Sequence, residues 1–113
     1  MEQDDCVFCN IVERSIPAKI IYEDDDVLVV PDILPKAPVH MLVITKRHIP
    51  IVSAMTEADE PLFGKMIFIA NKVAKDAKVD ETGYRLSFNV GREGGQVVPH
   101  VHLHVLGGKQ LSE

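Results

Sequence analysis

The sequence predicts an α+β fold in which a mainly antiparallel sheet packs against one long helix. Short apolar runs separated by turn residues fill the first half of the chain, as expected for neighbouring strands. Residues 56–78 then repeat apolar side chains at helical spacing. Residues 100–106 alternate histidine with apolar residues, which is the period-two pattern of a strand. Strands, one helix and further strands, in this order, are typical of α+β proteins.

The first half of the chain is expected to hold a short N-terminal element and two or three strands. Residues 6–14 can form a short helix or a zinc-binding loop, ended by Pro17. Pro31 stops a buried strand, and the prolines of residues 34–38 favour an irregular loop because proline disfavours helix and central strand. The expected strands cover residues 19–23, 27–30 and 40–45.

The long helix is followed by the second group of strands. Pro61 belongs in the first turn, because in a helix interior it costs about 3 kcal/mol. We therefore expect an N-cap at Asp59 or Glu60, with Thr56 in a preceding turn. Residues 84–90 form the next strand, and the apolar helix face is expected to contain Leu62, Met66, Ile69, Ala70, Val73 and Ala77.

Composition indicates one globular domain over residues 1–113. Apolar residues make up 46% and charged residues 26% of the chain, and 113 residues are enough to bury a core. The net charge of −5, without a cluster of lysine and arginine, argues against binding to DNA or RNA. An acidic start and the lack of a long apolar run argue against a signal peptide and a membrane span, so we expect a cytoplasmic protein.

The strand with three histidines carries the main chemical prediction. On one strand, His100, His102 and His104 point to the same face, and such a row can supply a nucleophile and proton carriers for phosphate chemistry. A solvated polar face and a metal site made by alternate histidines are the competing interpretations. The preceding loop, Gly91–Gln96, can turn successive N–H groups towards an anion, with Asn89 adding an amide, although most glycine-rich turns only reverse the chain.

Two further patterns indicate binding sites. Cys6 and Cys9 have the Cys-x-x-Cys spacing that suits one zinc ion, and His48 and His100 can complete a Cys₂His₂ set. A redox pair lacks its expected βαβ surroundings, and two free thiols are the remaining alternative. Asp32 follows an apolar strand, where a carboxylate can accept both ribose hydroxyls or can simply cap a turn.

Together these residues resemble the histidine-triad (HIT) family of nucleotide hydrolases and transferases. The match includes Gly94-Gly95-Gln96 and the motif His-apolar-His-apolar-His over residues 100–106. It is closest to the Hint branch of purine nucleoside phosphoramidases. Val97 departs from that branch, which usually has serine there to help the leaving group. Further matching segments are Ile16–Lys19, Glu23–Asp25, Asp32, Ala37–His40 and Lys46–His48.

The resemblance implies a five-stranded antiparallel sheet with one long helix, and a homodimer with a continuous ten-stranded sheet. It implies hydrolysis of the P–N bond of adenosine 5′-phosphoramidates through a nucleotidyl-histidine. Alternatives are dinucleoside polyphosphate hydrolysis, as in the Fhit-like branch, or a non-catalytic nucleotide-binding regulator. The zinc is then structural, and no catalytic metal is expected. Its ligands are Cys6, Cys9, His48 and His100.

The resemblance also assigns individual roles. His102 attacks the α-phosphate, His104 contacts the phosphate, and His40 is hydrogen-bonded to the nucleophile. Asp32 binds the ribose hydroxyls. The phosphate-loop positions are Asn89, Gly95 and Gln96, and the apolar purine pocket is formed by Val7, Phe8, Ile11, Val30 and Ile33.

Overall fold

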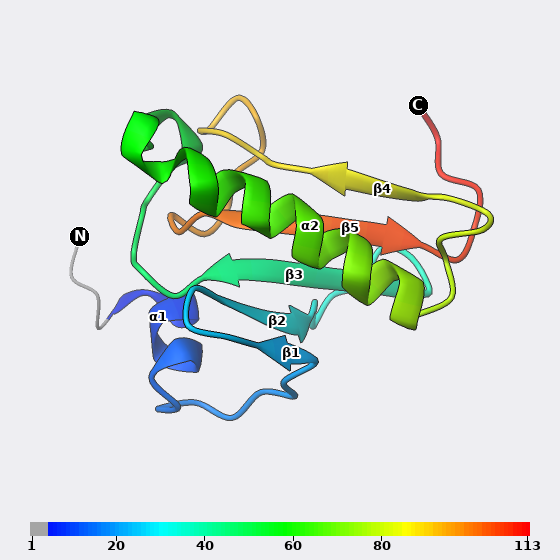
Figure 1. Ribbon diagram of the computed structural model, residues 1–113, viewed down its shortest axis with the longest axis horizontal. Helices are drawn as coiled ribbons and strands as arrows, with labels where there is room; N and C mark the ends of the chain where they lie inside the picture. The colour runs from blue at the N-terminus through cyan, green and yellow to red at the C-terminus, as the bar shows by residue number, and fades with distance from the viewer. Residues whose placement is uncertain (1–4) are drawn as a thin grey trace.

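A computed structural model describes residues 5–113, so four of the five residues of the acidic start that argues against a signal peptide lie outside it. Five antiparallel strands form one sheet in the order β1-β2-β3-β5-β4, and the long helix α2 lies across one face of it (Figure 1). The α+β fold with a five-stranded sheet is therefore confirmed. The elements are α1 (Val7–Val12), β1 (Tyr22–Glu23), β2 (Val27–Pro31), β3 (Val39–Thr45), α2 (Glu60–Asp76), β4 (Tyr84–Ser87) and β5 (His102–Gly107).

Three strand boundaries differ from the sequence prediction by two residues or more. Strand β5 begins at His102, so His100 precedes it, because the N–H of Val101 donates to the carbonyl of Ile49 at 2.7 Å instead of joining the sheet. Strand β4 ends at Ser87, which pairs with His104, and the chain then turns into the glycine loop. Strand β1 is limited to two residues, which pair with Val29 and Leu28.

Helix α2 begins as predicted and ends earlier than predicted. Its N-cap is Asp59, and Pro61 lies in the first turn. A carboxylate oxygen of Asp59 also accepts the N–H of Thr56 at 2.9 Å, which closes a 3₁₀ turn over Glu57–Asp59 before the helix. The helix ends at Asp76 instead of Lys78, because Lys78 adopts a left-handed φ of 64° that a helix cannot continue.

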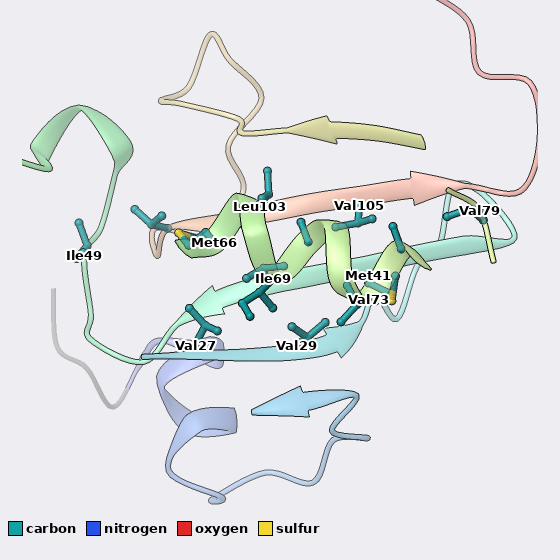
Figure 2. Close-up of a cluster of buried hydrophobic side chains, with 14 residues drawn as sticks. Val27, Val29, Met41, Ile49, Met66, Ile69, Val73, Val79, Leu103 and Val105 are labelled. Atoms are coloured by element: carbon teal, nitrogen blue, oxygen red, sulfur yellow. The ribbon is translucent and has the colours of Figure 1, made fainter. Parts of the chain in front are cut away.

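The core between α2 and the sheet is built from alternate strand residues. Valine, leucine and methionine side chains of β2, β3 and β5 point at the apolar face of the helix, which supplies Met66, Ile69 and Val73 (Figure 2). Each such side chain stabilises the fold by roughly 1.5–3 kcal/mol when fully buried. The strand residues on this face are Val27, Val29, Met41, Val43, Leu103 and Val105.

The other face of the sheet is also apolar, at the end that α1 covers. Phe8 and the two cysteines from the start of the chain pack against this face. The strand residues that they meet are Leu28, Val30, Leu42 and Ile44, which alternate with the residues beneath α2. Period-two alternation thus divides the sheet into a face for the long helix and a face for α1.

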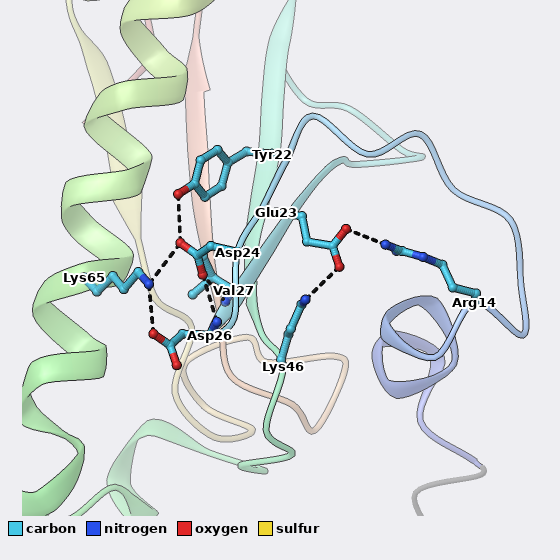
Figure 3. Close-up of polar contacts among 8 residues, drawn as sticks. All are labelled: Arg14, Tyr22, Glu23, Asp24, Asp26, Val27, Lys46 and Lys65. Carbon is cyan, nitrogen blue, oxygen red and sulfur yellow. Dashed lines mark hydrogen bonds and ion pairs between the residues drawn. The ribbon is translucent and has the colours of Figure 1, made fainter.

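Polar contacts tie the turn between β1 and β2 to its surroundings (Figure 3). Lys65 of α2 forms ion pairs with Asp24 at 3.0 Å and Asp26 at 2.8 Å, and the hydroxyl of Tyr22 donates to Asp24 at 2.8 Å. Hydrogen bonds to Asp26 and Asp24 raise the pKa of the Lys65 ammonium. Glu23 accepts from Lys46 at 2.7 Å and from Arg14 on its other oxygen. The ion pairs of Lys65 hold the turn between β1 and β2 against the second turn of α2.

Across residues 5–113, no helix combines the length and the apolar character that a membrane span requires.

Candidate active site and metal centre

The candidate catalytic histidines lie on the sheet face opposite α2. Register places His102 beside Ile44 and His104 beside Leu42, and both of those neighbours belong to the α1 face. His102 is only 8% exposed. The interpretation of the histidine row as a solvated polar face is therefore wrong, because both faces of β5 are covered at this end.

One ring nitrogen of His102 is engaged and defines the state of the other. Nδ1 of His102 lies 2.6 Å from the carbonyl oxygen of His100. A carbonyl can only accept, so Nδ1 carries the proton and Nε2 has a free lone pair in the neutral ring. The Phe8 ring packs edge-on against the same imidazole, with centroids 4.9 Å apart. His102 is thus held as an oriented base with one available nitrogen.

His40 contacts His104 and not the nucleophile candidate. Nε2 of His40 lies 3.0 Å from Nδ1 of His104 and 3.3 Å from a carboxylate oxygen of Asp32. The predicted hydrogen bond from His40 to His102 is wrong. Register explains the difference: His40 pairs with Leu106, which is two residues from His104 but four from His102.

A backbone group sets the direction of this hydrogen-bond chain. The N–H of Lys36 donates to Nδ1 of His40 at 3.1 Å, so the proton of neutral His40 is on Nε2. Nε2–H then donates to Nδ1 of His104, and His104 keeps its own proton on Nε2. Asp32, His40 and His104 have donor atoms close enough together for a metal ion. However, a protonated Nε2 makes His40 a hydrogen-bond donor here and unsuited to be a ligand.

Burial keeps these imidazoles neutral. Desolvation, together with the neighbouring His102 and His40, lowers the pKa of His104 to about 4. Desolvation also lowers the pKa of His102 and of His40, where nearby Asp32 opposes the shift. A neutral imidazole is the form that can attack phosphorus, so the environment favours nucleophilic chemistry near neutral pH.

Four potential metal ligands converge at the N-terminal side of β5. Nδ1 of His100 lies 3.3 Å from Sγ of Cys6, 3.6 Å from Sγ of Cys9 and 3.2 Å from Nδ1 of His48. Zinc bond lengths in tetrahedral geometry place such donor atoms about 3.3–3.6 Å apart. Cys6, Cys9, His48 and His100 therefore fit a structural zinc ion.

The state of the donors agrees with a metal site. Nε2 of His100 lies 2.7 Å from the carbonyl oxygen of Thr45, so this nitrogen carries the proton and Nδ1 is free to be a ligand. Burial, with Cys6 nearby, raises the pKa of Cys9 to about 12. A bound cation would supply the charge that a thiolate needs in such a buried position. Thr45 orients His100 through its backbone carbonyl. Sequence patterns do not reveal this role, because every residue type has a carbonyl and the contact depends on the folded chain.

The glycine loop is held by its own hydrogen bonds. The N–H groups of Gly94, Gly95 and Gln96 all donate to carbonyls of Gly91 or Arg92, at 3.0–3.1 Å. These three amides therefore do not form the predicted anion-binding nest. The side chain of Asn89 donates to the carbonyl of Gly94 at 2.8 Å.

Gln96 spans the same loop from inside. Its amide oxygen accepts the N–H of Gly91 at 2.9 Å, and its amide nitrogen donates to the carbonyls of Pro50 at 2.8 Å and Val98 at 3.0 Å. Gly95 has a φ of 83°, a left-handed conformation that favours glycine. In this structure, Asn89, Gly95 and Gln96 shape the loop that leads into the histidines.

The predicted purine pocket is only partly brought together. Phe8 and Val30 are buried in one cluster, against which Ile11 packs. Ile33 is 91% exposed on the loop after β2, and Val7 is 41% exposed. The cluster has further apolar members, Leu28, Leu42 and Ile44, which sequence reasoning did not select. Period-two alternation could have identified them, because these even-numbered residues of β2 and β3 point away from α2.

Comparisons with known proteins agree with this site. The model of the family described as HIT domain matches residues 13–111. The chain is 43% identical over 108 residues to the purine nucleoside phosphoramidase of Escherichia coli (strain K12), covering 96% of this chain and 91% of that protein. It is also similar to a HIT family hydrolase from Legionella pneumophila, with a TM-score of 0.93, 42% identity and 96% of each chain covered. A Zn-bound histidine triad family protein from Mycobacterium smegmatis has a TM-score of 0.81 and 31% identity, covering 96% of this chain and 78% of that one.

Proposed function

Because this chain belongs to the HIT family, we propose that it is a hydrolase of purine nucleoside 5′-phosphoramidates that acts through a nucleotidyl intermediate on His102. The observation that carries this proposal is the 2.6 Å contact between Nδ1 of His102 and the carbonyl of His100, because it leaves Nε2 as a free base. The name of the Escherichia coli relative, purine nucleoside phosphoramidase, supports the substrate class.

The first step is attack at phosphorus. Nε2 of His102 forms a bond to the α-phosphorus while the bond from phosphorus to the amine nitrogen breaks, and the departing amine takes a proton from water. In the second step, water adds to phosphorus, the P–Nε2 bond breaks, and the proton that this water loses neutralises the hydroxide left by the first step. The products are a nucleoside monophosphate and a free amine, and His102 returns to its neutral form. Splitting the hydrolysis into two displacements is the usual advantage of a covalent intermediate.

His104 and Asp32 bind the rest of the reacting nucleotide. His104 receives a hydrogen bond from His40 on Nδ1, so its Nε2–H can donate to a non-bridging phosphate oxygen where negative charge develops. Asp32 accepts the N–H of Leu34 at 2.9 Å and contacts His40, and its carboxylate keeps further lone pairs for the ribose hydroxyls. Its side chain is 17% exposed, so those lone pairs can be reached from solvent.

The contacts of the protein with the purine base and with the phosphate are predictions from the family resemblance. We place the purine base against Phe8, Val30 and the partly buried Ile11, with Val7 and Ile33 at the solvent edge of the predicted pocket. Asn89, Gly95 and Gln96 serve the phosphate by fixing the loop before β5.

We assign the structural zinc to Cys6, Cys9, His48 and His100. Bound there, zinc supplies a cross-link between the start of the chain, the segment after β3 and the start of β5. We expect about one equivalent of zinc in protein purified under reducing conditions without added metal. A folded, reduced sample with less than about a tenth of an equivalent contradicts the assignment, given tight structural zinc binding.

We also propose a homodimer formed through the outer edge of β4, with one HIT domain over residues 1–113 in each subunit. Helix α2 contacts the residue that follows β4 through the Phe63–Phe88 stack, with ring centroids 4.9 Å apart, and Ile67, one turn further along the helix, is 38% exposed. An apolar helix face next to a free strand edge suits a second copy of the chain. Sedimentation velocity tests this interface: Ile67→Lys is expected to give monomers, and a parent protein that is monomeric at every concentration contradicts the dimer.

A cytoplasmic location and a lack of nucleic-acid or membrane partners complete the proposal. The free, buried thiols of Cys6 and Cys9 suit a reducing compartment. The net charge of −5 disfavours binding to polyanions.

Trapping the intermediate tests the catalytic proposal. The protein is mixed with an AMP amide, quenched after milliseconds to seconds, and analysed by mass spectrometry of its peptides. An adenylyl group on the peptide with His102 is expected in the parent, and none is expected in His102→Ala. Equal, slow hydrolysis by the parent and His102→Ala contradicts the assignment.

Substrate competition tests the leaving group. An AMP amide and a diadenosine polyphosphate are offered together, and hydrolysis of each is followed by chromatography. Preference for the amide supports a phosphoramidase, whereas preference for the dinucleotide assigns the protein to polyphosphate hydrolysis. Tight nucleotide binding without hydrolysis of either substrate indicates a regulatory binding protein instead.

A further inference from the structure

His100 takes part in the metal centre and in the arrangement of the nucleophile at the same time. Nδ1 of its ring points at the two cysteines and His48, and its carbonyl oxygen accepts from His102 at 2.6 Å. The residue is completely buried, and its Nε2 is held by Thr45. Ring and carbonyl belong to the same buried residue, and both ring nitrogens are engaged, so fixing the ring restricts the backbone that carries the acceptor for His102.

Phe8 provides a second physical connection between the two sites. It lies between Cys6 and Cys9, and Cys6 caps the short helix α1 by accepting the N–H of Cys9. The Phe8 ring stands edge-on against His102 at 4.9 Å and against His100 at 5.8 Å, and it is 7% exposed. Whatever fixes the two cysteines therefore also fixes the ring that packs against the imidazole of His102.

Helix α1 needs such an anchor. It has six residues, which is at most half of the roughly 12–15 at which an isolated helix becomes marginally stable in water. Its first turn contains no acidic residue and its last turn no basic residue, so charge does not favour either end. A cross-link at Cys6 and Cys9 would add a restraint on this segment to the packing of Phe8 in its buried cluster.

We propose that the metal centre positions the catalytic nucleophile: ligation of Cys6, Cys9, His48 and His100 holds the His100 carbonyl on Nδ1 of His102 and holds Phe8 against its ring. His100 and Phe8 are positioning residues that act through His102. Zinc is thus coupled to the reaction without touching the substrate. Only the expected change in kcat rests on the proposed function. The tautomer of His102 can be measured in the absence of substrate.

His48 offers a test that leaves Phe8, His100 and both cysteines unchanged. His48→Ala removes one ligand, and His48→Cys is the matched control because three cysteines and one histidine also form a zinc site. Zinc content is measured by mass spectrometry. The ring state of His102 is read from long-range ¹H–¹⁵N spectra of the full-length protein, which distinguish the two neutral tautomers.

The parent and His48→Cys are expected to hold about one equivalent of zinc and to show His102 as a single tautomer with the proton on Nδ1. His48→Ala, treated with a chelator, is expected to lose zinc, to show both tautomers, and to hydrolyse the AMP amide with a kcat lowered about 10-fold or more, the usual effect of removing an outer-shell partner. A zinc-free His48→Ala with the parent's tautomer and kcat overturns the proposal.

Two further measurements make the outcome decisive. If His48→Ala does not fold, zinc-loaded Phe8→Leu replaces it: all four ligands remain, and both tautomers of His102 are expected, while an unchanged single tautomer overturns the role of Phe8. If the parent hydrolyses no nucleotide substrate, the proposed function fails. The tautomer of His102 in the zinc-loaded and zinc-free proteins then still decides whether the two sites are coupled.

Discussion

Nε2 of His40 lies 3.0 Å from Nδ1 of His104, although the two residues are far apart in the chain. The contact directs a hydrogen bond from the backbone of Lys36 through His40 to His104. Because Nδ1 of His104 accepts this hydrogen bond, the proton of neutral His104 is on Nε2, which can donate it to a bound phosphate. A donor prepared in advance of substrate binding does not need to reorganise during the reaction.

Removing this relay is expected to slow catalysis. His40→Ala deletes the donor to His104, and kcat for an AMP amide should fall about 10- to 100-fold. His40→Asn can still donate from its amide and should lose less. Stopped-flow or steady-state release of AMP measures both variants, with circular dichroism as a check on folding. Activity of His40→Ala within twofold of the parent contradicts the relay.

The buried imidazoles predict how stability depends on pH. Burial lowers the pKa of His104 from 6.5 to about 4. Between these values the unfolded chain binds more protons than the folded protein, so the free energy of unfolding decreases as the pH falls from 6.5 towards 4. Above about pH 7.5, His104 is neutral in both states and makes no pH-dependent contribution.

Urea denaturation at fixed ionic strength between pH 4.5 and 8 measures this dependence. His104→Asn should show a shallower decline at acid pH than the parent. Some decline should remain, because burial also lowers the pKa of His40 and His102. Identical slopes for the variant and the parent indicate that His104 titrates alike in both states.

A core substitution tests the layer beneath α2. Met66 is fully buried between the helix and the sheet, and Met66→Ala is expected to lower the free energy of unfolding by about 2–5 kcal/mol. Lys72→Ala on the same helix breaks an exposed ion pair with Asp76 and a cation–π contact with Tyr22 at 5.6 Å, and should change this free energy by at most about 1.5 kcal/mol. Chemical denaturation with both variants compares the two positions directly.

Val97 is the position at which leaving-group chemistry is expected to respond. Its side chain is 89% exposed, so Val97→Ser adds a hydroxyl without disturbing the core. If that hydroxyl hydrogen-bonds to the leaving amine, kcat/KM for a phosphoramidate should increase about 2- to 10-fold, the value of one net hydrogen bond. Val97→Ala removes the same methyl groups without adding a donor and should leave kcat/KM unchanged. A Ser variant indistinguishable from the Ala variant argues against this role.

Patterns within single segments predicted most of the fold. The helical spacing before Val73 and the position of Pro61 located α2 and its N-cap, since both depend on local backbone geometry. The alternation in β5 correctly placed His102 and His104 on one face, because side-chain direction in a strand follows directly from residue number. The ends of β4 and β5 were less accessible, since they depend on where neighbouring segments stop pairing.

Relations between segments could not be read in the same way. The partner of His40 is set by the register of β3 on β5, and no pattern in either segment specifies that Leu42 faces His104. The hydrogen bonds of the glycine loop likewise depend on a side chain, Gln96, that reaches back to Pro50. The Cys₂His₂ set was found because ligand type and spacing are chemical properties of the sequence, whereas the carbonyl of Thr45 that orients His100 belongs to the folded backbone.

The two-sided sheet has a consequence for the lengths of its strands. Inserting one residue between His102 and His104 would turn every later side chain of β5 over, so that His104 faced the apolar helix and Val105 faced the side of the sheet that now holds the histidines. A deletion in β3 between His40 and Thr45 would do the same to its partner strand. Homologous chains should therefore differ in length in the loops after Thr45 and before Pro99. They should keep the number of residues in β3 and β5 constant, even where the side chains themselves have changed.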